Sequence, residues 1–502
     1  MHAALLPLIK ELTTIAELGS IHSVLSWDQE TYMPQGAIES RAAALSLIAG
    51  LCHDRHTSQT FTDLLKTVVD IQTGQPFLAD LSPQEHRMLQ EIHRDWRMAN
   101  TLPTDFVTRY SSLQSQSQYH WQKARQANDF SIFAPYLDKV IAMTRQKADY
   151  FGWQYTPYNA LLDEYEPGAT TTALTPLFTR LKEAIIPLLH TIQKKDAFSA
   201  LPKGPYDKAI QLKFSHFLLR EMGFEFDHGR LDISTHPFTT QFHPTDVRIT
   251  TRFNESDVME GISGTLHEGG HALYEQGLDP ARFGTPLGAA VSLGIHESQS
   301  RLWENFIGKS PAFWQHYLPQ LQSAFPPLAN VPFADFYQAI NQVKPSFIRV
   351  ESDELTYNLH ILIRYEIEQL IFQDQIPVQE LPELWNQKYE EYLGITPPDD
   401  AHGILQDVHW SMGAFGYFPT YTLGNFYAAQ LWETLLSAFP ALEQNIQNGD
   451  LIQVRGWLKT HIHRLGKEKP AETLMAELTG QPLSEKAFVS YITKKYNQIY
   501  GL

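Results

Sequence analysis

The stretch that decides the fold is His267-Glu268-Gly269-Gly270-His271, an H-E-x-x-H pentapeptide. In an α-helix, residues four positions apart lie on one face, so the two imidazoles would converge on one metal ion. Glu268 would lie beside the metal without binding it. A general base in that place can take a proton from a water that the metal acidifies. The pentapeptide therefore predicts a catalytic zinc site.

The residues around the pentapeptide predict one helix from Asn254 to Gln276, with Asn254 as its N-cap and Gly277 after its end. Inside a helix, Gly269 and Gly270 each cost about 1 kcal/mol relative to alanine. Glycines at such positions indicate close approach by another backbone or by a ligand. The alternative is a surface helix that carries histidines at this spacing by chance.

A catalytic zinc site needs a third protein ligand and an open fourth position. The best candidate is Glu297, which lies 26 residues beyond the pentapeptide in a second predicted helix over residues 291 to 307. Glu297, Arg301 and Glu304 share one polar face of that helix. His296 is a rival ligand, and an exposed polar face explains the same pattern equally well.

Further motifs lie on both sides of these two helices. They follow one another as Ser26-Trp27-Asp28-Gln29-Glu30-Thr31-Tyr32-Met33-Pro34, His236-Pro237-Phe238, Asp246-Val247-Arg248-Ile249-Thr250, His296-Glu297-Ser298-Gln299, Ile348-Arg349-Val350-Glu351-Ser352-Asp353-Glu354-Leu355-Thr356-Tyr357 and Gly403-Ile404-Leu405-Gln406-Asp407-Val408-His409-Trp410. Together with the pentapeptide, these motifs resemble the M32 carboxypeptidases of the carboxypeptidase Taq type. The resemblance runs from residue 26 to beyond residue 410, in family order.

The resemblance implies a metal-dependent peptidase that removes single amino acids from the C-terminus of peptides. It also implies a mainly α protein, with a helical zinc-peptidase fold whose two lobes surround a deep substrate groove, and commonly a homodimer. The family assigns His267, His271 and Glu297 to one Zn²⁺ per chain, and Glu268 to catalysis. Co²⁺ or Mn²⁺ can substitute in such a site, because His/carboxylate ligands discriminate weakly between these metals.

Peptide hydrolysis develops a negatively charged oxygen, so the site needs donors aimed at that position. We favour His409 and Tyr421 as these donors, by analogy with related helical zinc peptidases. Tyr417 is a close competitor. Packing of all three side chains in a core is the alternative.

A carboxypeptidase must also bind a free terminal carboxylate, which a planar guanidinium does with two parallel hydrogen bonds. Arg349 and Arg248 are the candidates. Arg248 lies in the alternating run Val247–Phe253, which predicts a short strand, and it could instead pair with Asp246. His236 is either a substrate contact or a turn residue without a role.

The predicted helix from Asp353 to Phe372 carries one polar stripe, formed by Tyr357, His360, Arg364 and Glu368. Such a stripe is usually a solvated face. The family resemblance favours a place for its N-terminal end along the groove.

The chain is predicted to form a single peptidase unit over residues 1–502. Residues 1–200 would form a helical wall and a lid, residues 230–310 would bind the metal, and residues 345–425 would complete the substrate side. A small sheet around residues 230 to 253 is the only strand region that the sequence predicts.

Composition restricts the partners and the location of the protein. The 39 basic and 56 acidic residues give a net charge of −17, which disfavours nucleic acid and anionic membranes. Cys52 is the only cysteine, so an intramolecular disulfide and a cysteine-built zinc site are both excluded. The uncharged run over residues 283 to 295 is too short to span a bilayer. We expect a soluble, cytoplasmic protein whose partners are peptides with a free C-terminus.

Three other functions stay open at this point. An oligopeptidase or dipeptidyl carboxypeptidase would use an equivalent zinc site with a different groove end. A peptide-binding protein would retain the site without useful turnover. A purely structural helical scaffold is disfavoured by the two glycines in the middle of the metal-binding helix.

Overall fold

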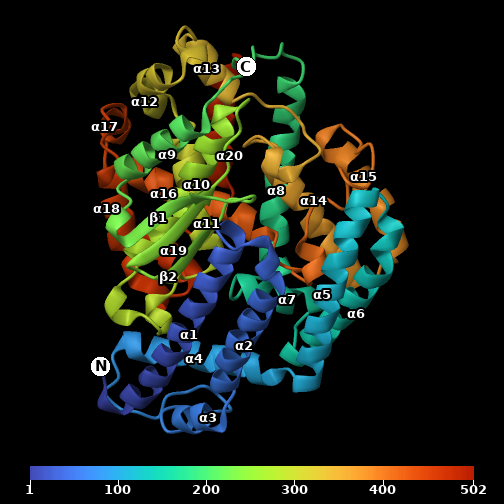
Figure 1. Ribbon diagram of the computed structural model, residues 1–502, viewed down its shortest axis with the longest axis vertical. Coiled ribbons are helices and arrows are strands. Elements are labelled where there is room, and N and C mark those ends of the chain that lie inside the picture. Colours follow the sequence, from blue (N-terminus) through green and yellow to red (C-terminus); the bar gives the residue numbers. More distant parts are fainter.

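The computed structural model describes residues 1–502 and is mainly helical (Figure 1). Nine α-helices precede the sheet: α1 (Leu6–Thr31), α2 (Ile38–His56), α3 (Gln59–Lys66), α4 (Pro83–Thr101), α5 (Thr104–Ala127), α6 (Ala134–Phe151), α7 (Pro157–Tyr165), α8 (Thr171–Ile192) and α9 (Lys208–Met222). In Figure 1, α1 to α4 lie at the lower end of the molecule and α5 and α6 lie along its right side.

The only sheet lies between α9 and α10 and has three strands, β1 (Gly229–Ile233), β2 (Thr239–His243) and β3 (Asp246–Thr251). Their order is β1-β3-β2. Strand β3 pairs in parallel with β1 and antiparallel with β2, so β2 is an edge strand. Val247 and Ile249 of β3 are fully buried, as the alternating sequence predicts. The predicted strand region is therefore confirmed.

Eleven α-helices follow the sheet: α10 (Val258–Gly277), α11 (Leu293–Arg301), α12 (Pro311–Ala324), α13 (Phe333–Ile340), α14 (Tyr357–Gln369), α15 (Leu381–Leu393), α16 (Pro419–Ala438), α17 (Leu442–Gln447), α18 (Ile452–His461), α19 (Ala471–Thr479) and α20 (Lys486–Tyr500). Helix α11 continues as a π-helix over Leu302–Ile307. None of the helices combines the length and the apolar character that crossing a bilayer requires.

The main hydrophobic core contains 94 buried residues, and α10, α11, α14 and α16 all contribute to it. A separate core of ten buried residues packs α1, α3 and α4 together with Leu287. Helix α2 buries none of its residues. The N-terminal helices are thus held by a small core of their own, while the elements around the pentapeptide share the large one.

The helix that carries the pentapeptide begins later than the sequence predicts. Its N-cap is Asp257, whose side chain accepts a hydrogen bond from the backbone N–H of Met259 at 2.9 Å. Asn254 instead accepts from the N–H of Ser256 in the preceding turn. The predicted cap was wrong because asparagine and aspartate both suit a cap and both suit a turn, so the sequence alone does not separate them.

The polar stripe on α14 is not a solvated face. His360, Arg364 and Glu368 are fully buried, and Tyr357 is 7% exposed. These polar groups can be buried because hydrogen bonds and ion pairs to other parts of the chain satisfy them. For example, Arg364 pairs with Asp407. The solvated-face interpretation was therefore wrong.

Candidate metal centre

Helices α10 and α11 lie in close contact because glycine stands at position 270 of α10. A Cβ built on Gly270 would lie 2.6 Å from the carbonyl oxygen of Gln299 and 2.7 Å from Cα of Ser300, both in α11. On Gly269, a Cβ would lie 2.8 Å from Met222. The inference that these glycines permit close approach by another backbone is confirmed at Gly270.

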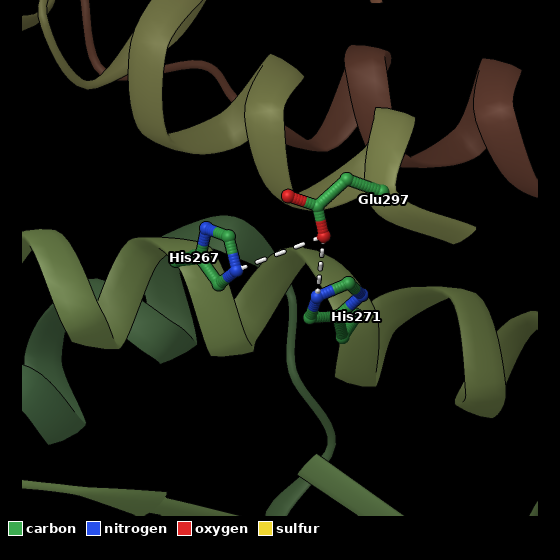
Figure 2. Close-up of side chains that lie close together, drawn as sticks. All are labelled: His267, His271 and Glu297. Carbon is green, nitrogen blue, oxygen red and sulfur yellow. Dashed lines mark ion pairs between the residues drawn. The ribbon is translucent and has the colours of Figure 1, made fainter. Parts of the chain in front are cut away.

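His267, His271 and Glu297 bring three possible ligand atoms together (Figure 2). Oε2 of Glu297 lies 3.9 Å from Nε2 of His267 and 3.4 Å from Nε2 of His271. A tetrahedral zinc ion with bonds of about 2 Å places its ligand atoms about 3.3 Å apart. The donor set is therefore that of a zinc site; the His271–Glu297 spacing matches it, and the His267–Glu297 spacing is about 0.6 Å longer.

Neighbouring side chains leave the ligand atoms free for the metal. Nδ1 of His267 lies 2.9 Å from Oε2 of Glu304, so Nδ1 carries a proton and Nε2 is the nitrogen that could bind a metal ion. Arg301 donates to Oε1 of Glu297 at 2.7 Å, which leaves Oε2 facing the imidazoles. Each of these ligands is thus oriented by a second side chain.

Burial and neighbouring charges set the protonation states of these three residues. At His267, burial opposes the charged form, but Glu297 and Glu304 outweigh it and raise the pKa above its ordinary value. Burial lowers the pKa of His271 to about 3, so its imidazole is neutral. Burial alone would raise the pKa of Glu297, but Arg301 and His267 hold that pKa well below its ordinary value. The carboxylate is therefore ionised.

His296, the rival ligand, lies outside the group of three. Its Nε2 lies 2.7 Å from Oε1 of Glu275, and its ring stacks on that of His271 with centroids 4.6 Å apart. His296 therefore supports the ligand His271 by packing.

Glu268 follows His267 in α10 and does not belong to the group formed by His267, His271 and Glu297. It is 8% exposed, and its Oε2 accepts a hydrogen bond of 2.8 Å from Thr239 of the edge strand β2. Burial raises the pKa of Glu268 above its ordinary value, as suits a carboxylate that must accept a proton. Strand β2 thus orients this carboxylate.

The side chains of His409, at the start of the 3₁₀ turn His409–Met412, and of Tyr417 and Tyr421 lie together. Nε2 of His409 is 3.4 Å from the hydroxyl of Tyr421, and the rings of Tyr417 and Tyr421 are 5.4 Å apart. Burial lowers the pKa of His409 to about 4 and raises the pKa of Tyr421 well above its ordinary value. At neutral pH the site thus contains a neutral imidazole next to a protonated phenol, and both can donate.

Arg349 belongs to a buried cluster with an excess positive charge. Its Nη2 donates to Oδ1 of Asp407 at 2.9 Å, while Arg364 pairs with Oδ2 of the same carboxylate at 2.6 Å. Two guanidinium groups therefore share one carboxylate. Nη1 of Arg349 also donates to the hydroxyl of Tyr357 at 3.1 Å, and the Tyr357 ring lies against Arg301, 4.2 Å from its guanidinium carbon. This chain of contacts connects Arg349 to the metal ligands.

The charge of Arg248 is neutralised by Asp246 on the same strand. Its guanidinium binds both carboxylate oxygens of Asp246, and it lies between the rings of Trp27 and Phe242, 4.8 and 5.0 Å from their centres. The pairing with Asp246 that the sequence left open is therefore present. His236 is exposed in the turn before β2, and its carbonyl accepts a hydrogen bond from Ser234 at 2.6 Å.

Sequence reasoning missed the supporting residues Thr239 and Asp407. Thr239 carries no local signal, because its contact with Glu268 depends on how β2 packs against α10. Asp407 does lie within a quoted motif, and a carboxylate so close to a predicted catalytic histidine was a usable signal. Its double pairing with arginines is visible only in three dimensions.

The fold and the site together define a mainly helical metalloprotein with an H-E-x-x-H helix and a glutamate from the facing helix. Residues 7–496 match the model of the carboxypeptidase Taq (M32) metallopeptidase family. The chain is 41% identical to carboxypeptidase 1 of Bacillus subtilis over 98% of this chain and 97% of that protein. It is 40% identical to thermostable carboxypeptidase 1 of Thermus thermophilus over 97% of each.

A crystal structure of the M32 carboxypeptidase from Deinococcus radiodurans is similar to this one, with a TM-score of 0.96, 39% identity and complete coverage of both chains. The chain therefore belongs to the M32 family, as its motifs predicted. It is a metallocarboxypeptidase, a peptide hydrolase that depends on a metal ion.

Proposed function

We propose that this metallocarboxypeptidase uses zinc and removes single amino acids from the free C-terminus of peptides. The observation that carries the proposal is the convergence of His267, His271 and Glu297, with Glu268 beside them. Two imidazoles and one carboxylate are a ligand set of catalytic zinc sites. Co²⁺ or Mn²⁺ would also support activity, because geometry and availability select among these metals more than affinity does.

A zinc ion at this position supplies Lewis acidity, both to the attacking water and to the scissile carbonyl. Glu268 takes the proton of the attacking water and later passes it to the leaving amine. The hydrogen bond from Thr239 fixes the carboxylate in one orientation, so proton transfer needs no rearrangement of the side chain. This role is supported by the burial of Glu268 and its raised pKa.

His409 and Tyr421 donate to the oxygen that becomes negative when water attacks. Their 3.4 Å separation and their protonation states at neutral pH support this role. Tyr417 packs against both rings and keeps Tyr421 in place. Donors that are held before the reaction stabilise the developing charge without reorganisation.

Arg349 binds the terminal carboxylate of the peptide. The cluster of Arg349, Arg364 and Asp407 has one positive charge in excess, whereas Arg248 is fully paired with Asp246. A buried excess charge attracts an anion more strongly than a neutral pair does. The observations therefore favour Arg349 over Arg248, and a substrate contact by His236 stays a prediction.

Replacing Arg349 by methionine should lower kcat/KM on free-acid peptides by about 30-fold, because a hydrogen bond to a charged group contributes about 2 kcal/mol. Asp407 keeps its partner Arg364 in this variant, so no buried charge is left unpaired. Steady-state kinetics of Arg349→Met and Arg248→Met on one free-acid peptide measure the effect. A larger loss in Arg248→Met would transfer the role to Arg248.

The experiment that tests the proposed function uses two peptides of one sequence, with a free or an amidated C-terminus, and mass spectrometry of the products. We expect successive loss of single residues from the free acid only. Chelation should stop the reaction, and added Zn²⁺ should restore it. Loss of residue pairs would indicate a dipeptidyl carboxypeptidase, cleavage of the amide an oligopeptidase, and binding without hydrolysis a peptide-binding protein.

On the family resemblance alone, we also propose that the protein forms a homodimer. Its partners would then be peptides and a second copy of the chain, with no nucleic acid and no membrane. The single cysteine supports a cytoplasmic location.

A further inference from the structure

Glu166 is a buried carboxylate far from the metal motifs in the sequence. It caps the C-terminal end of α7 and is 5% exposed. Three groups from two other helices donate to it: the Ser292 hydroxyl at 3.0 Å, the Gly294 N–H at 2.9 Å and the Tyr427 hydroxyl at 3.3 Å. A buried carboxylate with donors from separate elements holds those elements together.

Two of the donors lie at the start of α11, the helix that carries Glu297. Ser292 is the N-cap of α11, and Gly294 supplies an N–H of its first turn. A negative charge at this place is stabilised by the helix dipole. A side chain at Gly294 would disturb this contact, since a Cβ there would lie 2.8 Å from Oε2 of Glu166. Glu166 therefore fixes where α11 begins.

The third donor, Tyr427, belongs to α16, the helix that packs against Glu297. Gly424 lies one turn before Tyr427, and a Cβ on Gly424 would overlap the Glu297 side chain. The carboxylate of Glu166 thus accepts hydrogen bonds from α11, which carries Glu297, and from α16, which packs against it. Glu297 lies about one turn beyond Gly294, so a shift of α11 at its start would move the ligand.

A second buried carboxylate provides a natural comparison. Glu368 is fully buried and also accepts three hydrogen bonds, from the Tyr158 hydroxyl, the Trp410 indole and the Gly416 N–H. Burial raises the pKa of Glu166 and that of Glu368 to about 7. Glu368 makes no hydrogen bond to α10 or α11. It therefore matches Glu166 in burial and bonding but not in its contact with the metal-binding helices.

We propose that Glu166 is a positioning residue for the metal centre: by binding Ser292, Gly294 and Tyr427 together, it sets the place of Glu297 and with it the metal affinity. This inference rests on the proposed ligand set. It extends the metal centre to α7, a helix of the N-terminal part of the chain.

The test compares Glu166→Gln with Glu368→Gln and measures the dissociation constant of Zn²⁺ at pH 8, by competition with a chromophoric chelator on the full-length metal-free protein. Glutamine has nearly the same shape, but its amide NH₂ cannot accept the bonds that one carboxylate oxygen accepts. We expect Glu166→Gln to raise the dissociation constant at least tenfold, within the range seen when outer partners of metal ligands are lost. Glu368→Gln should leave it within twofold of the wild type.

Spectroscopy of the Co²⁺ form gives a readout that simple loss of stability does not change. A displaced Glu297 should alter the visible absorption bands in Glu166→Gln and leave them unchanged in Glu368→Gln. Tyr427→Phe removes only one donor and should raise the Zn²⁺ dissociation constant a few-fold, which keeps the proposal testable if Glu166→Gln does not fold.

Glu297→Gln serves as the reference, because it removes a proposed ligand. An unchanged dissociation constant in Glu297→Gln would overturn the ligand set itself. If Glu297→Gln weakens binding but Glu166→Gln does not, only the role of Glu166 is wrong. If Glu166→Gln and Glu368→Gln weaken Zn²⁺ binding equally, the proposed role of Glu166 is also wrong, since the loss of any buried carboxylate would then have this effect.

Discussion

Replacing Glu268 by glutamine should lower kcat by about 10³-fold while the protein still binds one metal ion per chain. General acid–base catalysis contributes about 10² to 10⁴ in rate, and a factor of 10³ corresponds to about 4 kcal/mol of transition-state stabilisation. Glutamine cannot take the proton of the attacking water. His267, His271 and Glu297 are untouched, so metal binding is preserved.

The surroundings of Glu268 allow glutamine to take the same position, so the substitution changes the chemistry of the group and not its placement. The hydrogen bond from Thr239 at 2.8 Å can be accepted equally well by the amide oxygen of glutamine, so the side chain keeps its place. Metal analysis and single-turnover rates on a free-acid peptide measure the two effects separately. Thr239→Val removes the bond to the Glu268 carboxylate and the bond from the same hydroxyl to the Glu268 carbonyl, and it should lower kcat about tenfold. A kcat near the wild-type value in Glu268→Gln would exclude Glu268 as the base.

The sequence predicted the elements whose signals are local. Helical periodicity in the pentapeptide predicted that His267 and His271 lie side by side on one helix, and the alternating run at Val247–Phe253 predicted β3. The glycine pair predicted the close approach of a second backbone, which proved to be that of α11. Such patterns predict the structure correctly because they depend only on the spacing of residues along one helix or strand.

The stripe on α14 shows where such reasoning fails. The sequence predicted a solvated face for His360, Arg364 and Glu368, because charged side chains are seldom buried. They are buried because distant segments supply their partners: Arg364 binds Asp407, and Glu368 binds Tyr158 and Trp410. These hydrogen-bonding partners lie 42 to 210 positions away in the sequence, so no local pattern contains them.

Replacing Gly270 by alanine should lower metal affinity by about 10- to 100-fold and destabilise the fold by about 2 kcal/mol. The new Cβ would lie 2.6 Å from a backbone oxygen of Gln299 and 2.7 Å from Cα of Ser300, and neither atom can move independently of α11. Carbon contacts need about 3.5 Å, so the two helices must separate by roughly 1 Å. Metal–ligand bonds tolerate only about 0.2 Å. Glu297 would then no longer reach an ion held by the histidines.

Gly264 on the same helix supplies the matched control. A Cβ there would lie 3.5 Å from Thr251 Oγ1 and 3.9 Å from Pro237 Cγ, and both are ordinary contacts. Gly264→Ala should therefore raise the free energy of unfolding by about 1 kcal/mol, because alanine has the higher helix propensity, and it should keep wild-type metal affinity. Thermal unfolding with and without Zn²⁺, together with chelator competition, measures both variants. Wild-type affinity in Gly270→Ala would mean that the helices can separate without moving the ligands. The close contact between α10 and α11 would then serve stability alone and not the placement of Glu297.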